Sequence, residues 1–413
     1  MPDKLPRPPA IILGGDDNAL SIARSLGRAG ITTYVINEPR ALVRNSRFCN
    51  WVDVPRTAGP LEADWAAYLL GDESNHLRGS VLLAASDAAL ELIAEHRPLL
   101  VTRFRLDLSN PAAQRCMLNK LCTYEAARQV GVPTPRFWVA DSREQIQAIA
   151  DELVFPLVVK PMLGHRYKRR FNGVAYPCAR TFDELLDSFE TITQAGIRTF
   201  LVEMIPGPDD RLCSYYSYLD ESGDNLFDYT KRVIRRLPFN MGQGVYHITD
   251  EVAGVRAPSL RLFRHVGLRG IGNAEFKLDA RDGQLKLIEC NARFTAADCL
   301  LTASGLNLSL FVYDRLTGRQ PEAPSRFRSG VRLWYPWLDY KAYRQMKKLG
   351  MLSFGQWARS VLHWQTFPVF RWYDPVPAIV SLARRIRRRI RRASRRRPRT
   401  AEGGRYLPDG SRP

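Results

Sequence analysis

Residues 273–293 read NAEFKLDARDGQLKLIECNAR, a pattern typical of two β-strands joined by a short turn. Side chains two positions apart on a strand lie on one face, so Glu289 and Asn291 share a face, and Arg293 joins them if the strand continues. Glu275 on the first strand can lie opposite this group. The stretch therefore predicts a hairpin that gathers two carboxylates, an amide oxygen and a guanidinium on one surface.

These side chains together have a specific chemical use. Carboxylate and amide oxygens are the hard ligands that Mg²⁺ takes, with its remaining positions left to water and phosphate oxygens. A guanidinium adds a planar cationic fork for phosphate. An isolated E-x-N motif is more often part of a solvated hairpin, so a metal site at Glu275, Glu289 and Asn291 depends on the rest of the chain.

The first 110 residues or so alternate between short apolar runs and helical patterns. An apolar run at 10–13 precedes a glycine turn at 14–15 and a helical pattern, and further apolar runs follow at 32–36 and 80–85. This alternation predicts an α/β fold that begins with a parallel, Rossmann-like sheet. The turn, GGDDNA, lacks the G-x-G-x-x-G spacing of a dinucleotide site, which favours an architectural turn or one that lines a substrate pocket.

Two lysines far apart in the sequence each lie beside an apolar segment. Lys120 lies in the helix-like stretch 118–129, and Lys160 lies in the predicted strand 155–161, FPLVVKP. A lysine in such a position is usually a surface residue whose stem packs on apolar neighbours. The following segment, LGHRYKRRFNG, is predicted to be a polar loop that can close over phosphates. Three roles are open for its basic residues 165–170. They can neutralise a triphosphate, bind an acidic substrate or partner, or simply face the solvent.

A third group of polar residues follows the apolar strand FLVEMIPG at 200–207. Glu203 precedes exposed main chain that can hydrogen-bond the edge of an adenine. Asp209 and Asp210 come next, where a ribose hydroxyl can be accepted, and Lys231 lies on a later strand.

In this order, the motifs resemble those of the ATP-grasp superfamily of carboxylate-amine ligases, and within it proteins similar to D-aspartate ligase and the carbamoyl-phosphate synthase large subunit. The resemblance covers about residues 10–320. It implies nucleotide contacts at Lys120, Lys160, Glu203, Met204, Ile205 and one of Asp209 or Asp210, metal ligands at Glu275, Glu289 and Asn291, and catalytic cations at Lys231 and Arg293. Arg232, Arg235 and Arg236 match the family's cationic stretch less closely.

The resemblance implies an ADP-forming ligase that makes an amide through an acyl phosphate, with ATP and Mg²⁺, or Mn²⁺ in its place, as cofactors. Its expected substrates are a carboxylate and an amine, either small metabolites or cell-envelope precursors. Two rival interpretations are a catalytically inactive ATP-binding module and a membrane-surface adaptor. Retention of the whole metal set favours the ligase, because an inactive descendant has no chemical reason to keep it.

The predicted organisation has four parts. A Rossmann-like domain spans 1–113, and a two-lobed ATP-grasp domain spans 114–320, with a small lobe at about 114–200 and a large lobe at about 201–320. A Trp- and Tyr-rich region at 321–383 and an Arg-rich tail at 384–413 form a helical, basic C-terminal extension.

The basic charge of the chain is concentrated at its end. The formal net charge is +19, and the tail 384–413 carries over half of it. A helix predicted from about 377 to 397 has a narrow apolar stripe between arginines. Such a helix can bind an anionic membrane surface, and the aromatic sequence before it favours this role. Binding to nucleic acid and a merely solubilising role remain alternatives.

The cysteines and the apolar segments bear on location. The seven cysteines contain no C-x-x-C pair and suggest no disulfide framework, which favours a reducing, cytoplasmic setting. The N-terminus lacks the pattern of a secretion signal. Charges and prolines interrupt the apolar stretch 361–383, so any membrane association is expected to be peripheral. The sequence leaves open whether the chain forms a homo-oligomer.

Overall fold

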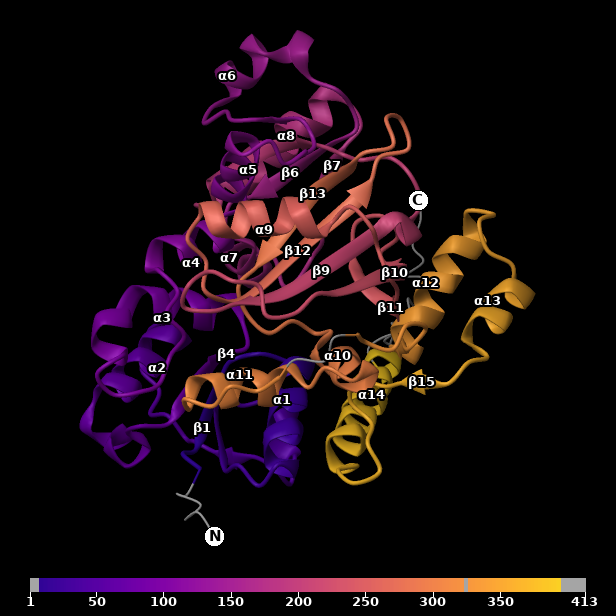
Figure 1. Cartoon of the computed structure of the whole chain (residues 1–413). Helices are drawn as coiled ribbons and strands as arrows, with labels where there is room; N and C mark the ends of the chain where they lie inside the picture. The colour runs from indigo at the N-terminus through magenta and orange to yellow at the C-terminus, as the bar shows by residue number, and fades with distance from the viewer. Residues whose placement is uncertain (1–6, 323–325, 395–413) are drawn as a thin grey trace, which may run out of the picture.

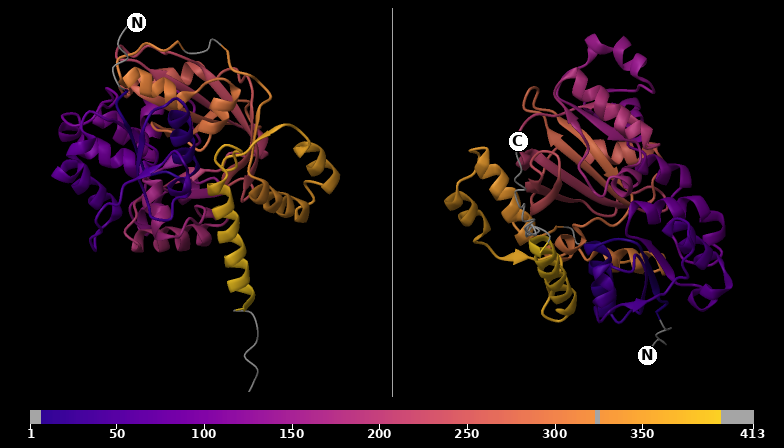
Figure 2. Two further views of the ribbon diagram at one scale, coloured as in Figure 1. Left: turned by 90° about the horizontal axis from the view of Figure 1, so that it is seen from below. Right: turned by 180° about the vertical axis from the view of Figure 1, so that it is seen from behind.

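The computed structural model describes residues 7–322 and 326–394 (Figure 1). These residues form three β-sheets covered by helices, which confirms the predicted α/β class. Two further views show the sheets and the C-terminal helix from below and from behind (Figure 2).

The first sheet is parallel, with strand order β3-β2-β1-β4, as the alternation at the start of the chain predicted. Its elements are β1 (Ala10–Leu13), α1 (Asp17–Arg28), β2 (Thr33–Ile36), η1 (Leu42–Asn45), β3 (Asn50–Trp51), α2 (Leu61–Leu70), η2 (Asp72–Leu77), β4 (Val81–Ala84) and α3 (Asp87–Leu100). The turns after β1 and β4 touch, because a Cβ atom at Gly14 would overlap the hydroxyl of Ser86. Gly14 also has a φ of +69°, so glycine is required there for two reasons.

The second sheet is antiparallel, with strand order β5-β8-β6-β7. Its elements are β5 (Phe137–Trp138), α6 (Arg143–Ala148), η3 (Ala150–Glu152), β6 (Leu157–Pro161), α7 (Gly164–Arg170), β7 (Cys178–Ala179), α8 (Phe182–Gln194) and β8 (Thr199–Glu203). The helices α4 (Pro111–Leu118) and α5 (Lys120–Gln129) connect the first sheet to it. The side chain of Asn119 accepts hydrogen bonds from two main-chain N–H groups of the first turn of α5, so Lys120 lies at a capped helix start.

The segment after Lys160 corrects the sequence prediction of a polar loop, because it contains the helix α7. Tyr167 is buried in the core of the second sheet and stacks on Phe171, four residues later, at 4.7 Å between ring centroids. This packing stabilises a helix where glycines and clustered charges favoured a loop.

Two of the cysteines are paired, although the sequence suggested no disulfide framework. Cys116 and Cys122 form a disulfide between α4 and α5. The other five cysteines are free. The turn between the two helices brings the pair together, which their spacing in the sequence does not reveal.

The third sheet has strand order β13-β12-β9-β10-β11-β14-β15 and is antiparallel except for its last pair. Its elements are η4 (Asp209–Arg211), β9 (Leu212–Leu219), β10 (Tyr229–Leu237), β11 (Gln243–Thr249), α9 (Arg256–His265), β12 (Gly270–Leu278), β13 (Leu285–Asn291), β14 (Arg332–Trp334) and β15 (Gln365–Thr366). The predicted hairpin is β12 and β13. On one face, Phe276 and Cys290 pack in a core with Phe263 of α9, and the opposite face carries the polar residues.

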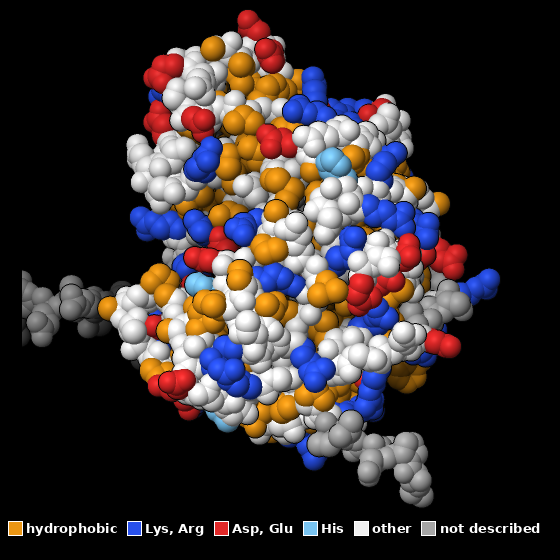
Figure 3. Space-filling model, turned by 60° about the vertical axis from the view of Figure 1, so that its left-hand side comes forward, with side chains coloured by type: hydrophobic (Ala, Val, Ile, Leu, Met, Phe, Trp, Pro, Cys, Tyr) orange, Lys and Arg blue, Asp and Glu red, His pale blue; other side chains and the backbone are white. Residues whose placement is uncertain are grey.

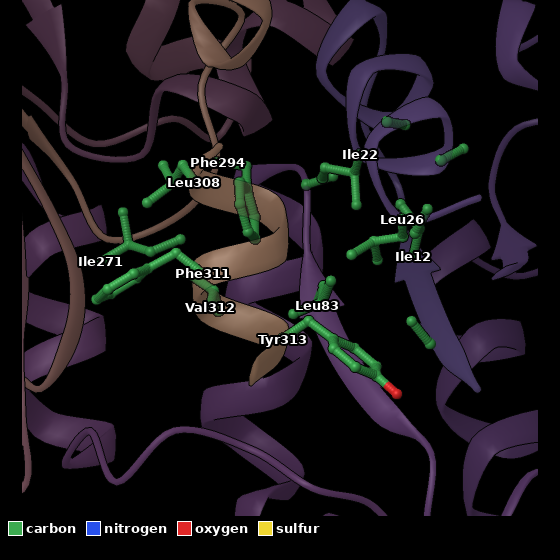
Figure 4. Close-up of a cluster of buried hydrophobic side chains, with 14 of the residues drawn as sticks. Ile12, Ile22, Leu26, Leu83, Ile271, Phe294, Leu308, Phe311, Val312 and Tyr313 are labelled. Atoms are coloured by element: carbon green, nitrogen blue, oxygen red, sulfur yellow. The ribbon is translucent and has the colours of Figure 1, made fainter. Parts of the chain in front are cut away.

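A buried apolar cluster joins the first sheet to the third (Figure 4). The helices α10 (Asp298–Ser304) and α11 (Leu308–Leu316) follow β13. Phe311 and Val312 of α11 belong to one core with Ile12 and Leu83 of the first sheet and Ile271 of β12. This core holds the first sheet against the end of β13 that carries the polar residues.

The C-terminal region extends the third sheet and then leaves it. It contains α12 (Pro336–Lys348), α13 (Phe354–Val361) and α14 (Val376–Ser394), and its strands β14 and β15 pair with β11 and with each other. The predicted domain boundaries remain predictions. The part of the predicted tail beyond 394 lies outside the described residues. Within 7–322 and 326–394, no helix is long and apolar enough to cross a bilayer.

Candidate functional site

Four strands of the third sheet place polar side chains in one row. The strand register pairs Glu289 with Glu275, Glu275 with Ser214, and Ser214 with Lys231. Directly paired residues on neighbouring antiparallel strands point to the same face, so the four side chains lie side by side. Within the row, Nζ of Lys231 donates a hydrogen bond to Oγ of Ser214 at 2.9 Å.

The two carboxylates of this row lie in unequal electrostatic surroundings. Like charges at directly opposed positions destabilise a sheet. Nζ of Lys120 lies 2.9 Å from Oε1 of Glu289. Burial raises the pKa of Glu289, but Lys120 and Lys160 outweigh it and hold that pKa below its usual range. Burial raises the pKa of Glu275, and Lys231 opposes this only in part, so the negative charge at Glu275 is incompletely compensated.

A second row supplies the amide predicted as a metal ligand. Nδ2 of Asn291 donates a hydrogen bond to Oδ1 of Asn273 at 3.1 Å. This bond leaves the side-chain oxygen Oδ1 of Asn291 as an acceptor on the same face as Glu289. The described residues hold no group of three His, Cys, Asp or Glu side chains that suits a metal. A cation here would therefore use two carboxylates and an amide oxygen. This donor set fits Mg²⁺, and a cation would offset the charge at Glu275.

Two lysines from separate elements reach the same strand. Nζ of Lys160 donates to the main-chain oxygen of Ile288 at 2.7 Å and to the hydroxyl of Tyr124 at 3.0 Å. Lys120 comes from the start of α5, and Lys160 from β6. Burial and the neighbouring Lys120 lower the pKa of Lys160 to about 7. Two lysines therefore lie beside one carboxylate. Lys120 is paired with Glu289, whereas Lys160 donates its hydrogen bonds to neutral oxygen atoms.

The low pKa of Lys160 predicts that nucleotide binding depends on pH. Above about pH 7 the free protein loses this proton, whereas a bound polyphosphate favours the charged ammonium. We expect the affinity for ADP to fall by up to about tenfold per pH unit above this value. The Lys160→Arg variant should bind with a flatter profile, because a guanidinium stays charged. Calorimetric titration on the alkaline side of neutrality measures both slopes, and equal slopes would contradict the prediction.

The predicted adenine-side residues lie at the end of β8. The carboxylate of Glu203 is buried, pairs with Arg281, and accepts a hydrogen bond from the main-chain N–H of Arg136 at 3.2 Å. Its side chain is therefore held by the protein. Arg281 lies in the turn between β12 and β13, so this ion pair joins the second sheet to the third.

The main chain after Glu203 leaves the N–H of Ile205 open. The carbonyl oxygen of Ile205 accepts a hydrogen bond from Nζ of Lys277 at 2.9 Å. The main-chain N–H group of Ile205 has no hydrogen-bond partner among the described residues. The thioether of Met204 lies 3.5 Å from Sγ of Cys178. This segment can thus present a main-chain donor beside an apolar surface, as the edge of a purine requires.

The two candidate ribose residues differ in availability. Asp209 is buried and accepts hydrogen bonds from Nε of Arg236 at 2.8 Å and from the N–H of Asn240 at 3.1 Å. Asp210 is exposed. Of the pair, Asp210 is the one free to bind a ligand.

Arg293 connects this face to the first sheet. Its guanidinium forms an ion pair with Asp87, the first residue of α3. Burial raises the pKa of Asp87, but Arg293 and Lys120 outweigh it and hold that pKa well below its usual range. Asp87 was not among the predicted residues, although its place directly after a strand, at the start of a helix, was the signal available.

The helix α7 begins beside Lys120 and docks on the helices α2 and α3 of the first sheet. Gly164 packs so closely on Lys120 that a Cβ atom would lie 3.3 Å from Cε of the lysine. Nε2 of His165 and Nη2 of Arg166 lie 2.8 and 2.9 Å from the two carboxylate oxygens of Glu91. Arg169 forms an ion pair with Glu62. The basic segment 165–170 is thus bound largely by acidic residues of α2 and α3.

A cleft of about 620 Å³ lies between α7 and the helices α2 and α3. Its lining includes Glu62, Glu91, Glu95, His165 and Arg169. On the side of the molecule where α2 and α3 lie, acidic and basic side chains are interspersed (Figure 3). The cleft can therefore admit a polar ligand.

The structure brings together most, but not all, of the predicted residues. Glu275, Glu289, Asn291 and Lys231 share one face, and Lys120 and Lys160 reach it from other elements. Two of the cations that matched less closely turn away: Arg235 binds Asp339 of α12 at 2.6 Å, and Arg232 binds Asp250 at 2.5 Å.

Comparison with known proteins shows which proteins this chain resembles. The carbamoyl-phosphate synthase L chain, ATP binding domain, matches residues 247–310, which include β12 and β13. D-Aspartate ligase of Enterococcus faecium is 23% identical over 395 residues, covering 88% of this chain and 92% of the relative.

Solved structures show the same fold. The biotin carboxylase domain of Hydrogenobacter thermophilus 2-oxoglutarate carboxylase, in complex with MgADP, has a TM-score of 0.59 at 15% identity and covers 78% of this chain and 73% of its own. The L-amino acid ligase of Bacillus licheniformis has a TM-score of 0.57 at 17% identity, with coverages of 76% and 75%.

The ligase names and the bound MgADP agree with the predicted enzyme class and cofactors. These matches confirm the predicted resemblance: the chain has the fold of the ATP-grasp superfamily and is related in sequence to D-aspartate ligase and to the carbamoyl-phosphate synthase large chain.

Proposed function

We propose that this protein is an ATP-dependent carboxylate-amine ligase that forms an amide through an acyl-phosphate intermediate. The observation that carries the proposal is the pair of adjacent carboxylates, Glu275 and Glu289, on a face that three lysines from separate elements approach. Such a face suits a polyphosphate and a divalent cation together, and the relation to D-aspartate ligase over most of both chains supports an amide-forming reaction.

The reaction explains why these residue types are needed. A carboxylate is a poor electrophile, because its charge repels the amine and it offers no good leaving group. Transfer of the γ-phosphoryl group of ATP to a carboxylate oxygen gives an acyl phosphate and ADP. Attack by the amine then forms the C–N bond and releases phosphate. The protein's task is to hold two anions together and to offset the charge that accumulates between them.

The residues divide this task between them. Lys120 and Lys160 bind phosphate oxygens, the N–H of Ile205 donates to the adenine, and Asp210 accepts from a ribose hydroxyl. Glu275, Glu289 and the side-chain oxygen of Asn291 would hold Mg²⁺, which when bound would neutralise phosphate charge. Lys231 and Arg293 oppose the remaining negative charge near the acceptor carboxylate. The guanidinium of Arg293 is paired through Nε with Asp87, and this ion pair fixes its orientation.

The substrates follow from the chemistry and from the relatives. We propose a small carboxylate and an amine, with amino acids and cell-envelope precursors as the first candidates because D-aspartate ligase spans nearly the whole chain. The cytoplasm, where ATP is available, is the proposed location.

Hydroxylamine trapping tests the proposal and does not require the natural amine. The full-length protein is incubated with Mg-ATP, hydroxylamine and one carboxylic acid at a time, and ADP and the hydroxamate are measured together. Hydroxylamine displaces phosphate from an acyl phosphate, so a substrate acid should give hydroxamate and ADP in equal amounts. The best acid is then paired with a panel of amines.

Omission of the acid is the control for idle ATP hydrolysis. ADP release that no acid stimulates, with no hydroxamate from any acid, would contradict the ligase. Nucleotide binding without turnover would instead favour the inactive ATP-binding module.

A further inference from the structure

The C-terminal part of the structure exposes an unusual amount of apolar surface. Most of the large apolar side chains that are exposed in the described residues lie between 340 and 390. Trp364 is 99% exposed and Trp372 is 87% exposed. Scattered apolar residues are normal on a protein surface, but a concentration of this kind marks an interaction site.

The helix α14 continues this surface away from the body of the protein. It projects as a rod, visible in the left-hand view of Figure 2. Ile379, Leu382, Ile386 and Ile390 follow one another at helical spacing, and each is between 49 and 63% exposed. Arginines at 384, 385 and 387–389 occupy the remaining faces of the same turns. The helix is therefore amphipathic, with an exposed apolar stripe between cationic flanks.

The base of this helix is firmly held. Asp374, two residues before α14, is 1% exposed and accepts hydrogen bonds from Nε of Arg24 at 2.8 Å, Oγ of Ser46 at 2.7 Å and the N–H of Arg47 at 3.0 Å. Its partners lie in α1 and just after η1. The exposed helix thus extends from a fixed point beside α1 and η1.

We propose that α14, together with Trp364 and Trp372, binds the surface of an anionic lipid bilayer. Arg385, Arg387 and Arg388 contact lipid phosphates, the apolar stripe enters the boundary between headgroups and acyl chains, and the tryptophans lie at the same level. The proposal goes beyond the ligase activity and does not depend on it.

Charge and apolarity together favour this partner over the alternatives. Non-specific binding to nucleic acid needs only cations along a phosphate backbone, and it leaves the apolar stripe and the tryptophans without a role. A second copy of the same helix would bring arginine flanks against arginine flanks, which repel. A helix that only aids solubility has no use for exposed isoleucines. An anionic bilayer offers phosphates and an apolar layer at once.

Vesicle binding by the full-length protein tests the proposal. The probes are vesicles of phosphatidylcholine with about 30% phosphatidylglycerol, vesicles of phosphatidylcholine alone, and poly(U) RNA, compared at one salt concentration near 0.1 M. We expect binding to the anionic vesicles at least tenfold tighter than to the neutral ones, weakened by added salt. Brominated lipids should quench tryptophan fluorescence.

Two variants separate the contributions of charge and apolar surface. Ile386→Ser with Ile390→Ser keeps every arginine and should lower vesicle affinity at least tenfold while leaving any RNA binding unchanged. Arg387→Gln with Arg388→Gln should lower it by about 25-fold, taking roughly fivefold per arginine. Leu99→Ser, which changes an equally exposed residue of α3, is the matched control and should bind as the wild type does.

These changes affect exposed side chains, so the variants should fold normally, and unchanged melting temperatures verify this. Vesicle binding that the double serine variant retains in full would overturn the proposal. A preference for poly(U) over anionic vesicles would overturn it in favour of nucleic acid. No binding of the wild type to either vesicle would also overturn it.

Discussion

Replacing Glu289 with glutamine is expected to lower the rate of ATP-dependent amide formation by about 10²-fold or more, the effect typical of removing one preorganised electrostatic group. Glu289 stands between Glu275 and Lys120, so in the proposed site it holds the cation and also orients Lys120, the lysine proposed to bind phosphate. The neutral amide keeps the shape of the side chain but loses the charge that attracts Mg²⁺. Steady-state ADP release at several Mg²⁺ concentrations measures the effect.

The form of the defect separates a metal ligand from a structural residue. We expect part of the lost rate to return at high Mg²⁺, because a weakened site fills at higher concentration. Glu251→Gln, a change at an exposed carboxylate after β11, is the matched control and should keep full activity. A Glu289→Gln variant that turns over at the wild-type rate, or that loses activity only by unfolding, would count against the proposed metal site.

Asp339→Asn is expected to destabilise the folded protein by about 3–5 kcal/mol. Asp339 is 0% exposed and accepts two hydrogen bonds from the Arg235 guanidinium, at 2.6 and 3.0 Å. Its Oδ2 also accepts from the indole N–H groups of Trp334 and Trp357, each at 2.9 Å. Removing the negative charge leaves a buried arginine without a counter-ion, and its desolvation is then uncompensated.

Denaturant unfolding followed by circular dichroism measures this change. Asp250→Asn removes a partner of Arg232 in a pair that is about one-third exposed on each side, and it is expected to cost less than about 1 kcal/mol. Equal destabilisation by the two substitutions would contradict the assignment of Asp339 as a buried anchor of α12 and α13.

Local patterns were enough to predict the central hairpin. Alternation along 273–279 and 284–289 places Glu275 and Glu289 on one face, and strand pairing then sets them opposite each other. Cys290 falls on the opposite face by the same rule and is buried in the core beneath α9. These features depend on neighbours a few residues away, which is why one sequence reveals them.

The helix α7 shows where local reasoning fails. The glycines and charges of the surrounding segment favour a loop, and three side chains of α7 gain their partners, Glu91 and Glu62, only through the fold. Asp209 shows the same limit. As part of a motif it is a candidate ligand for ribose, but tertiary packing places Arg236 and Asn240 on its carboxylate and leaves Asp210 exposed.

The sequence by itself determined the α/β class, the strand faces of the hairpin and the types of residue that meet at the proposed metal site, because strand periodicity is a local property of the chain. Only the tertiary structure decided that Lys120 and Lys160 converge on β13, that Asp87 holds Arg293, and that α14 extends from a buried anchor at Asp374. Each of these contacts joins residues that are about 130 to 350 positions apart in the sequence. Residues so far apart come into contact only because packed cores bring whole elements together.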